Sequence, residues 1–230
     1  MNIIITGASR GIGLETAVLL AQNKRHQLLL LSRNTRQLEL LKEEVLHHNI
    51  EFLPFDLLNP DSTGLVQKLE SWDKVDVIIN NAGKLVNKPF IELSSENWKE
   101  VYGVNVFGPA ELIRTCLPWL EKSARAHVLN ISSMGGFQGA SKFPGLAAYS
   151  SSKAALASLT ECLAEEFREK NIAVNCLALG AVQTEMLAEA FPGYEAPVSS
   201  EEMAAFVAYF AEYGHRFFNG KILPVALSTP

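Results

Sequence analysis

The sequence is poor in cysteine and contains no long apolar run. Its 230 residues include three cysteines, Cys116, Cys162 and Cys176, which lack the C-x-x-C spacing of redox and zinc motifs. This scarcity argues against a disulfide-stapled secreted scaffold and favours a reducing, cytoplasmic environment. Because no apolar stretch approaches the length of a bilayer span, we expect neither a transmembrane helix nor a membrane partner.

Positive charge is also scarce. The chain has 20 Lys and Arg against 25 Asp and Glu, a formal net charge of -5. A nucleic-acid surface needs a basic stripe, so no nucleic-acid partner is expected. The histidines show no metal-ligand spacing with cysteines or carboxylates, so we predict no metal site. The proportions of hydrophobic and charged residues, 48% and 20%, are those of an ordinary globular protein.

Short apolar runs alternate with amphipathic stretches along the chain. Buried strands are predicted at 3–5, 28–31, 75–79, 128–131 and 172–178, and helices at 12–22, 37–47, 96–120 and 148–170. This alternation is typical of βαβ units and predicts an α/β fold, a doubly wound parallel sheet of about seven strands with helices on both faces. Because no linker, repeat or low-complexity tract interrupts the pattern, we expect residues 1–230 to form a single domain.

The segment 184–200 carries turn-forming residues beside aromatic ones. It contains Pro192, Gly193 and Pro197 next to Phe191 and Tyr194. Ligands of open α/β sheets bind at the carboxyl ends of the strands, where such a segment would act as a flap. An ordinary surface loop would have the same composition.

A glycine-rich turn, TGASRGIG at 6–13, follows the first predicted strand and opens a helix. Gly7 permits a sharp turn, Gly11 a close approach to a pyrophosphate, and Gly13 tight packing of the helix on the strand. The N–H groups and dipole at the helix N-terminus attract phosphate. The turn therefore predicts a dinucleotide site, and a tight turn without a ligand is the alternative. The predicted binding residues are Gly7, Ser9, Arg10, Gly11, Ile12 and Gly13.

The end of the second strand bears on which dinucleotide is bound. An acidic residue there binds the ribose hydroxyls of NAD(H) and repels a 2′-phosphate. This chain has Ser32 and Arg33 at that place and no carboxylate, and Arg10 adds a second positive charge. Arginine pairs with phosphate through a charge-assisted fork. We therefore predict that NADP(H) is preferred over NAD(H); the alternative is that Arg33 is a solvated loop cation.

Tyr149 and Lys153 are separated by one helical turn, so their side chains share a helix face. A tyrosine with an ordinary pKa of about 10 is a poor proton donor at neutral pH. A neighbouring ammonium would lower that pKa and would also hold the nicotinamide ribose. Ser133 follows the strand predicted at 128–131, where its hydroxyl would orient a substrate carbonyl oxygen. The alternatives are a surface Tyr–Lys pair and a serine that satisfies backbone at a strand end.

Together these motifs resemble those of the short-chain dehydrogenase/reductase family, over essentially the full length of the chain. The matching positions occur in the family's order, at 6–13, Asp56, Asn80-Asn81-Ala82-Gly83, Asn105, Ser133, Tyr149 and Lys153. The resemblance implies a Rossmann-type sheet in which Asp56 and Leu57 flank the adenine ring. It also implies that Asn80, Ala82 and Gly83 line the central part of the cofactor. From the residues alone, Asp56 is equally a turn residue, and Asn80-Asn81 equally a strand-end turn.

The resemblance assigns two further parts of the site. Asn105 would distort its helix and hold a water on the proton path to Lys153, whereas the residues alone suggest a buried asparagine bonded to backbone. After the sixth strand, Gly180, Val182 and Thr184 match the family, and Val182 and Thr184 would hold the nicotinamide carboxamide. This chain has Leu179 where the family has a proline. Without the proline ring, φ is less restricted in this loop.

These observations favour an NADP(H)-dependent oxidoreductase of the carbonyl reductase type. Hydride would pass between nicotinamide and a carbonyl or secondary alcohol, with Tyr149 as general acid/base, Lys153 as its modulator, Ser133 as the oxygen-orienting donor and Asn105 in the proton relay. The apolar and aromatic residues of 134–146 and the flap predict a small hydrophobic or aromatic substrate. The alternative is an NADP(H)-binding regulatory module without turnover.

The oligomeric state follows from the resemblance alone. Members of the family commonly form homodimers or homotetramers through the two long helices, here predicted at 96–120 and 148–170. Both helices are apolar enough to allow this, but faces buried in the protein's own core would give the same pattern.

Overall fold

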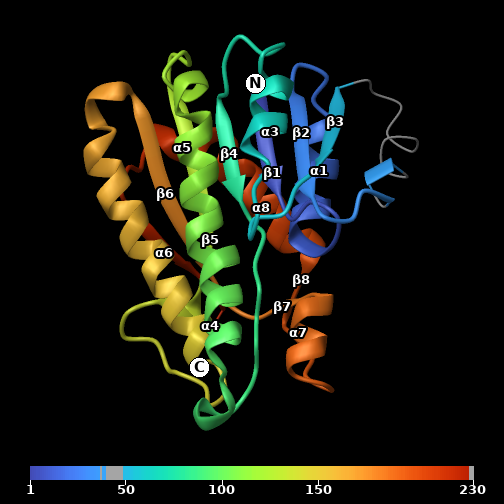
Figure 1. Ribbon diagram of the computed structural model, residues 1–230, viewed down its shortest axis with the longest axis vertical. Coiled ribbons are helices and arrows are strands. Elements are labelled where there is room, and N and C mark those ends of the chain that lie inside the picture. The colour runs from blue at the N-terminus through green and yellow to red at the C-terminus, as the bar shows by residue number, and fades with distance from the viewer. Residues whose placement is uncertain (37, 40–48, 228–230) are drawn as a thin grey trace.

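The computed structural model describes residues 1–36, 38–39 and 49–227. Seven parallel strands form one sheet in the order β3-β2-β1-β4-β5-β6-β9 (Figure 1). The strands are β1 (Asn2–Thr6), β2 (Gln27–Ser32), β3 (Ile50–Pro54), β4 (Val77–Asn80), β5 (Ala126–Ser133), β6 (Ile172–Leu179) and β9 (Ile222–Val225). The predicted α/β fold with a doubly wound parallel sheet is therefore confirmed. Five of these strands coincide with the predicted apolar runs, whereas β3 and β9 were not among them.

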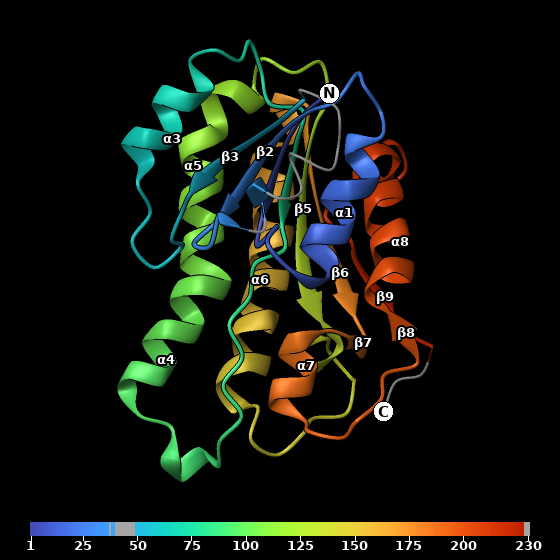
Figure 2. The same ribbon diagram turned by 90° about the vertical axis from the view of Figure 1, so that its right-hand side faces the viewer.

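Helices cover both faces of the sheet (Figure 2). One face carries α1 (Gly11–Ala21) and α8 (Ser200–Tyr213), and the other carries α3 (Ser62–Leu69), α5 (Gly108–Leu120) and α6 (Ala147–Glu166). Successive residues of a strand point to opposite faces, so Ile3 and Ile5 pack in the first layer and Ile4 in the second. Burial on both faces explains why the strands are continuously apolar.

The helix boundaries differ from the predicted ones in several places. The helix predicted at 148–170 ends at Glu166 and continues as a short 3₁₀ turn, Arg168–Lys170. The helices α3 and α8 were not predicted. Apart from residues 38 and 39, the helix predicted at 37–47 lies outside the described residues.

The long helix predicted at 96–120 is divided by a change of helix type. It consists of α4 (Ser95–Tyr102), a π-helical segment (Gly103–Phe107) and α5. Two glycines let this long helix pass close to the turn after β3. A Cβ added at Gly103 would lie 2.4 Å from Leu58 Cδ2, and one added at Gly108 would lie 2.6 Å from Leu57 Cβ. The distortion expected around Asn105 is thus present, since the π-helical segment contains that residue.

The carboxyl ends of the strands lie beside the segment predicted to be a flap, which contains a short helix. Figure 2 shows α7 (Glu185–Ala190) beyond the tips of β5 and β6. The flap begins and ends at a small parallel pair, in which β7 (Val182–Gln183) is bonded to β8 (Val198–Ser199). This pair fixes both ends of segment 184–197, so the intervening chain projects as a closed loop over the sheet.

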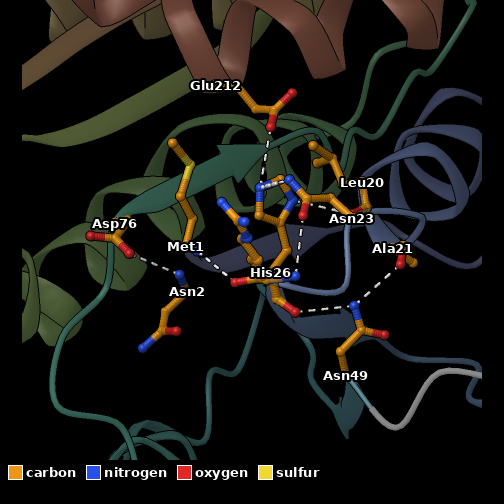
Figure 3. A network of polar contacts seen from close by, with 10 residues as sticks. Met1, Asn2, Leu20, Ala21, Asn23, His26, Asn49, Asp76 and Glu212 are labelled. Carbon is orange, nitrogen blue, oxygen red and sulfur yellow. Dashed lines mark hydrogen bonds and ion pairs between the residues drawn. The ribbon is translucent and has the colours of Figure 1, made fainter.

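A polar network lies at the opposite end of the sheet, where the strands begin (Figure 3). The backbone N–H of Asn2 donates to Asp76 Oδ2 at 2.9 Å. The buried ring of His26 contacts the Leu20 carbonyl at 3.1 Å and Glu212 Oε1 of α8 at 3.2 Å. The network ties α1, β2 and α8 together at the end of the molecule remote from the flap. Within the described ranges, none of the helices has the length and hydropathy needed to cross a membrane.

Candidate active site

A cavity of ≈ 1050 Å³ opens at the carboxyl ends of the strands. Residues that follow each of the seven strands of the main sheet line it, together with the start of α6 and the flap. This is the place where open α/β sheets bind ligands, because the loops that connect strands to helices leave a crevice there. The volume exceeds the size of most small-molecule pockets and suits an extended ligand beside a smaller one.

The glycine turn forms one wall of the cavity as a backbone cradle. Gly7 and Gly11 have positive φ values of 66° and 54°, a conformation that favours glycine. A Cβ added at Gly7 would lie 2.8 Å from Ala82 Cα, and one at Gly13 would lie 2.4 Å from the Gly7 carbonyl oxygen. A side chain at Gly7 or Gly13 would therefore clash, because the turn, α1 and the chain after β4 pack closely together.

The first turn of α1 is open to an anionic ligand. Among the described residues, no side chain caps this helix, and its first turn, Gly11 to Gly13, contains no acidic residue. Helix N-termini normally satisfy their free N–H groups with a capping side chain. Because the turn also borders the cavity, its N–H groups and the helix dipole fit a dinucleotide pyrophosphate.

Two arginines border the neighbouring part of the cavity, where β2 ends. The N–H of Gly7 donates to the Leu31 carbonyl at 2.9 Å, which places the glycine turn beside Ser32 and Arg33. The Arg33 side chain is exposed and has no hydrogen-bond or ion-pair partner in the described part of the chain. In contrast, Arg10 pairs with Glu189 of α7, with 3.1 Å between Nη1 and Oε1.

Ser133, Tyr149 and Lys153 meet on the wall formed by β5 and α6. Ser133 ends β5, and its hydroxyl is hydrogen-bonded to the phenol of Tyr149 in the first turn of α6. Lys153 Nζ lies 5.9 Å from the centroid of the Tyr149 ring and donates to the Ile131 carbonyl at 2.7 Å. All three side chains border the cavity. The helical spacing of Tyr149 and Lys153 therefore does bring a phenol and an amine to one surface.

Burial dominates the electrostatics of this pair. It lowers the pKa of Lys153 to about 8, because an ammonium loses hydration in the interior. It raises the pKa of Tyr149, and the hydrogen bond from Ser133 opposes this only in part. The expectation that Lys153 lowers the pKa of Tyr149 is thus wrong for the chain by itself. The physical reason is that desolvation of the buried phenolate outweighs the lowering by Ser133.

A chain of buried amides and hydroxyls positions this wall. Asn80 Nδ2 donates to Asn130 Oδ1 at 2.8 Å, and Asn130 Nδ2 donates to Thr160 Oγ1 of α6 at 2.9 Å. The Ser132 hydroxyl donates to the Lys153 carbonyl at 2.8 Å. Buried polar groups that are paired in this way hold their elements in one register. The bonds therefore fasten β4, β5 and α6 directly behind the site.

Asn105 is bonded mainly to backbone, as the residues alone suggested. Its Oδ1 accepts from the Lys84 N–H at 2.8 Å, and its Nδ2 donates to the Lys84 carbonyl and to Ser152 Oγ, each at 2.9 Å. A Cβ added at Gly83 would lie 3.7 Å from Asn105 Oδ1 and 3.6 Å from Lys153 Nζ. Asn105 thus holds the chain after β4 next to the amine of Lys153.

Most of the predicted site residues border the cavity. They are Gly7, Ser9, Arg10, Gly11, Ile12, Ser32, Arg33, Asp56, Leu57, Ala82, Gly83, Ser133, Tyr149, Lys153, Gly180, Val182 and Thr184. Within the described part of the chain, Gly13, Asn80 and Asn105 do not, since each is packed behind the surface. The Asp56 carboxylate also accepts from the Leu58 N–H at 3.0 Å, so the turn interpretation of Asp56 holds as well.

Sequence reasoning missed several residues that border the cavity. Asn81, rather than Asn80, reaches it, because consecutive residues at the end of a strand face opposite ways. Lys84 and Glu100 contribute an ion pair at 3.5 Å. Ala226 and Leu227 come from the chain after β9. The sequence of β9 gave only a partial signal for the last two, because Pro224 interrupts its apolar residues.

A Rossmann-type sheet with a glycine cradle and a Ser–Tyr–Lys wall defines a dinucleotide-binding class of fold. A sequence profile described as short chain dehydrogenase matches residues 1–195. An uncharacterised oxidoreductase from Staphylococcus saprophyticus is 34% identical over 189 residues, which cover 80% of this chain and 75% of the relative. The chain therefore belongs to the short-chain dehydrogenase family and is an oxidoreductase of that type.

Solved structures agree with this assignment. A putative short chain dehydrogenase from Escherichia coli, complexed with NADPH, has a TM-score of 0.85 and 28% identity, with 97% of this chain and 95% of the other covered. A 4-hydroxyisoleucine dehydrogenase complexed with NADH has a TM-score of 0.85 and 26% identity, with 98% and 96% covered.

Proposed function

We propose that this protein is an NADP(H)-dependent oxidoreductase that interconverts a small carbonyl compound and its secondary alcohol. The observation that carries the proposal is the convergence of Ser133, Tyr149 and Lys153 on one cavity wall, beside an uncapped glycine turn. The neighbours of known structure that bind NADH or NADPH support a nicotinamide cofactor. When bound, such a cofactor supplies or accepts a hydride at its nicotinamide ring.

In this proposal the chain's own residues bind the cofactor, orient and protonate the substrate, and supply a proton relay. The glycine turn and the N-terminus of α1 hold the pyrophosphate, Asp56 and Leu57 border the adenine, and Val182 and Thr184 hold the carboxamide. Ser133 orients the substrate oxygen, to which Tyr149 gives a proton during reduction. Lys153 holds the ribose and returns a proton to the relay, in keeping with its pKa of about 8.

The substrate part of the cavity is mainly apolar. Met134, Phe143 and Leu146 come from the segment after β5, and Leu187 and Phe191 come from the flap. An apolar wall favours a hydrophobic or aromatic carbonyl compound, because a charged or highly hydroxylated one would lose hydration without gaining partners. We further propose that residues 1–230 act as one domain and that 184–200 moves as a flap over the substrate.

The preference for NADP(H) rests on the end of β2. Arg33 is exposed at the cavity and unpaired among the described residues, and no carboxylate occupies the end of that strand. A free guanidinium is suited to a phosphate dianion. Replacement by Arg33→Ala should therefore weaken NADPH binding and leave NADH binding nearly unchanged, as measured by cofactor fluorescence. Equal loss for both cofactors would contradict this preference.

The decisive experiment is Tyr149→Phe, assayed against a panel of ketones, aldehydes and diketones. We expect turnover to fall by about 10²–10⁴-fold while the affinity for NADPH changes only a few-fold, because only the transferable proton is removed. Tyr194→Phe is the matched control, since Tyr194 also borders the cavity but lies on the flap. NADPH binding without turnover by the unmodified protein on the whole panel would favour the alternative, a regulatory module.

The proposals for assembly and location come from an exposed aromatic residue and from the cysteines. Phe107, at the junction of the π-helical segment and α5, is 64% exposed, which suits a homodimer or homotetramer interface on the long helices. The three cysteines are all free, as in a cytoplasmic protein. Sedimentation at several concentrations checks the first proposal, and loss of association in Phe107→Ser would support it.

A further inference from the structure

Arg10 and Glu189 join the glycine turn to the flap. The ion pair is exposed, with side-chain exposures of 47% and 69%, and its partners lie 179 residues apart in sequence. The two segments also touch at their bases, because a Cβ added at Gly11 would lie 3.4 Å from Thr184 Cγ2. The pair is therefore part of a contact by which α7 rests on the cofactor-binding turn.

The ion pair makes the two arginines of this region unequal. Arg33 has no ion-pair partner among the described residues, whereas the guanidinium of Arg10 is paired with the Glu189 carboxylate. A 2′-phosphate carries close to two negative charges, so it gains most from guanidinium groups that no other anion occupies. A nearby carboxylate opposes binding of the 2′-phosphate in two ways: it occupies Arg10, and it repels the phosphate directly.

We propose that Glu189 is a specificity-determining residue, which limits the preference of this site for a 2′-phosphorylated cofactor by competing for Arg10. The inference rests on the proposed binding of NADP(H) and assigns a residue of the flap to cofactor selection. An NAD(H) molecule lacks the 2′-phosphate, so its binding leaves the pair between Arg10 and Glu189 undisturbed. Glu189 therefore acts on the ratio of the two affinities rather than on dinucleotide binding in general.

The test measures binding of two cofactor fragments by calorimetry at low ionic strength. Adenosine 2′,5′-bisphosphate carries the discriminating phosphate, and adenosine 5′-monophosphate lacks it; neither contains the nicotinamide ring. For Glu189→Gln we expect the bisphosphate to bind about two- to five-fold more tightly relative to the monophosphate, the range typical of an exposed ion pair. In Arg10→Ala the same glutamine substitution should have a smaller effect, because competition for Arg10 is gone and only the direct repulsion of the phosphate is relieved.

The matched control is Glu195→Gln. Glu195 is an exposed carboxylate of the same flap and has no ion-pair partner among the described residues. The Glu195→Gln substitution should leave the ratio of the two affinities unchanged. An unchanged or smaller ratio in Glu189→Gln, with a normal preference in the unmodified protein and a normal effect of Arg33→Ala, would overturn this inference alone. Equal binding of both fragments by the unmodified protein would overturn the NADP(H) preference, and the inference with it.

Discussion

The cavity has two unlike walls. The wall of β5 and α6 carries Ser133, Tyr149 and Lys153 on regular elements, and buried hydrogen bonds such as that between Asn130 and Thr160 hold it in place. The flap wall is held by exposed contacts, among them the Arg10–Glu189 pair and the 2.9 Å bond from Asn87 Nδ2 to the Ala190 carbonyl. The difference teaches that the residues to which we assign the chemistry lie on the wall with buried contacts, here called the rigid wall, whereas Glu189, to which we assign cofactor selection, lies on the wall with exposed contacts.

The largest expected effect is on turnover when the rigid wall loses its amine. Lys153→Met keeps an unbranched chain of nearly the same length but removes the donor, so turnover should fall by about 10²–10⁴-fold. Lys84→Met is the matched control, because Lys84 also borders the cavity but pairs with Glu100 outside the Ser–Tyr–Lys wall. Steady-state kinetics with circular dichroism as a folding check would decide, and equal losses in both variants would show that the loss is not specific to the amine of the Ser–Tyr–Lys wall.

The next effect is the pH dependence of the free energy of unfolding, to which a buried histidine of β5 contributes. His127 is fully buried, its ring contacts the Ala211 carbonyl at 3.0 Å, and burial lowers its pKa to about 4. The unfolded chain binds this proton near the ordinary pKa of about 6.5, so between these values the unfolded state holds more protons. The free energy of unfolding should therefore decrease by about 3 kcal/mol as the pH falls from 6.5 to 4.

The measurement for that prediction is urea denaturation at several pH values. His127→Gln should flatten the slope between pH 6.5 and 4, because glutamine does not titrate. His26 contributes in the same direction, since burial also lowers its pKa. A variant with the slope of the unmodified protein would show that protonation of His127 does not limit the stability of this wall.

A smaller effect is expected from crowding the contact between the turn after β5 and α6. A Cβ added at Gly136 would lie 2.6 Å from the Ala154 nitrogen and the Lys153 carbonyl carbon, which are backbone atoms that cannot move aside. Gly136→Ala should therefore lower the free energy of unfolding by about 1–3 kcal/mol. Gly83→Ala should stay within about 0.5 kcal/mol, because its nearest neighbour is 3.6 Å away. Chemical denaturation compares them, and equal losses would contradict the packing argument.

The smallest effect is expected on the flap. Asn87→Ala removes the exposed bond to Ala190, which is worth about 0.5–1.5 kcal/mol. We expect KM for the substrate to rise a few-fold with kcat nearly unchanged. Gln138→Ala, an exposed position in the segment after β5 with no side-chain partner among the described residues, is the control. A fall in kcat as large as that of Lys153→Met would mean that the flap belongs to the catalytic wall.

Local patterns predicted the elements that have strong local causes. The isoleucines of β1 and the leucines of β2 form strands buried on both faces, as their continuous apolar character predicted, and the glycine spacing at 7, 11 and 13 marked the turn between β1 and α1. The strands β3 and β9 were harder, because Glu51 and Pro224 interrupt their apolar character. They lie at the two edges of the sheet, where burial on both faces is incomplete.

Sequence by itself determined the alternation of strands and helices, five of the seven strands of the main sheet, the glycine turn, and the shared helix face of Tyr149 and Lys153, since each depends on residues near in the chain. Tertiary structure alone decided that Asn81 rather than Asn80 reaches the cavity, that burial raises the pKa of Tyr149, and that Glu189 meets Arg10. These outcomes depend on desolvation and on contacts between distant segments, which exist only after the sheet has brought its strand ends together.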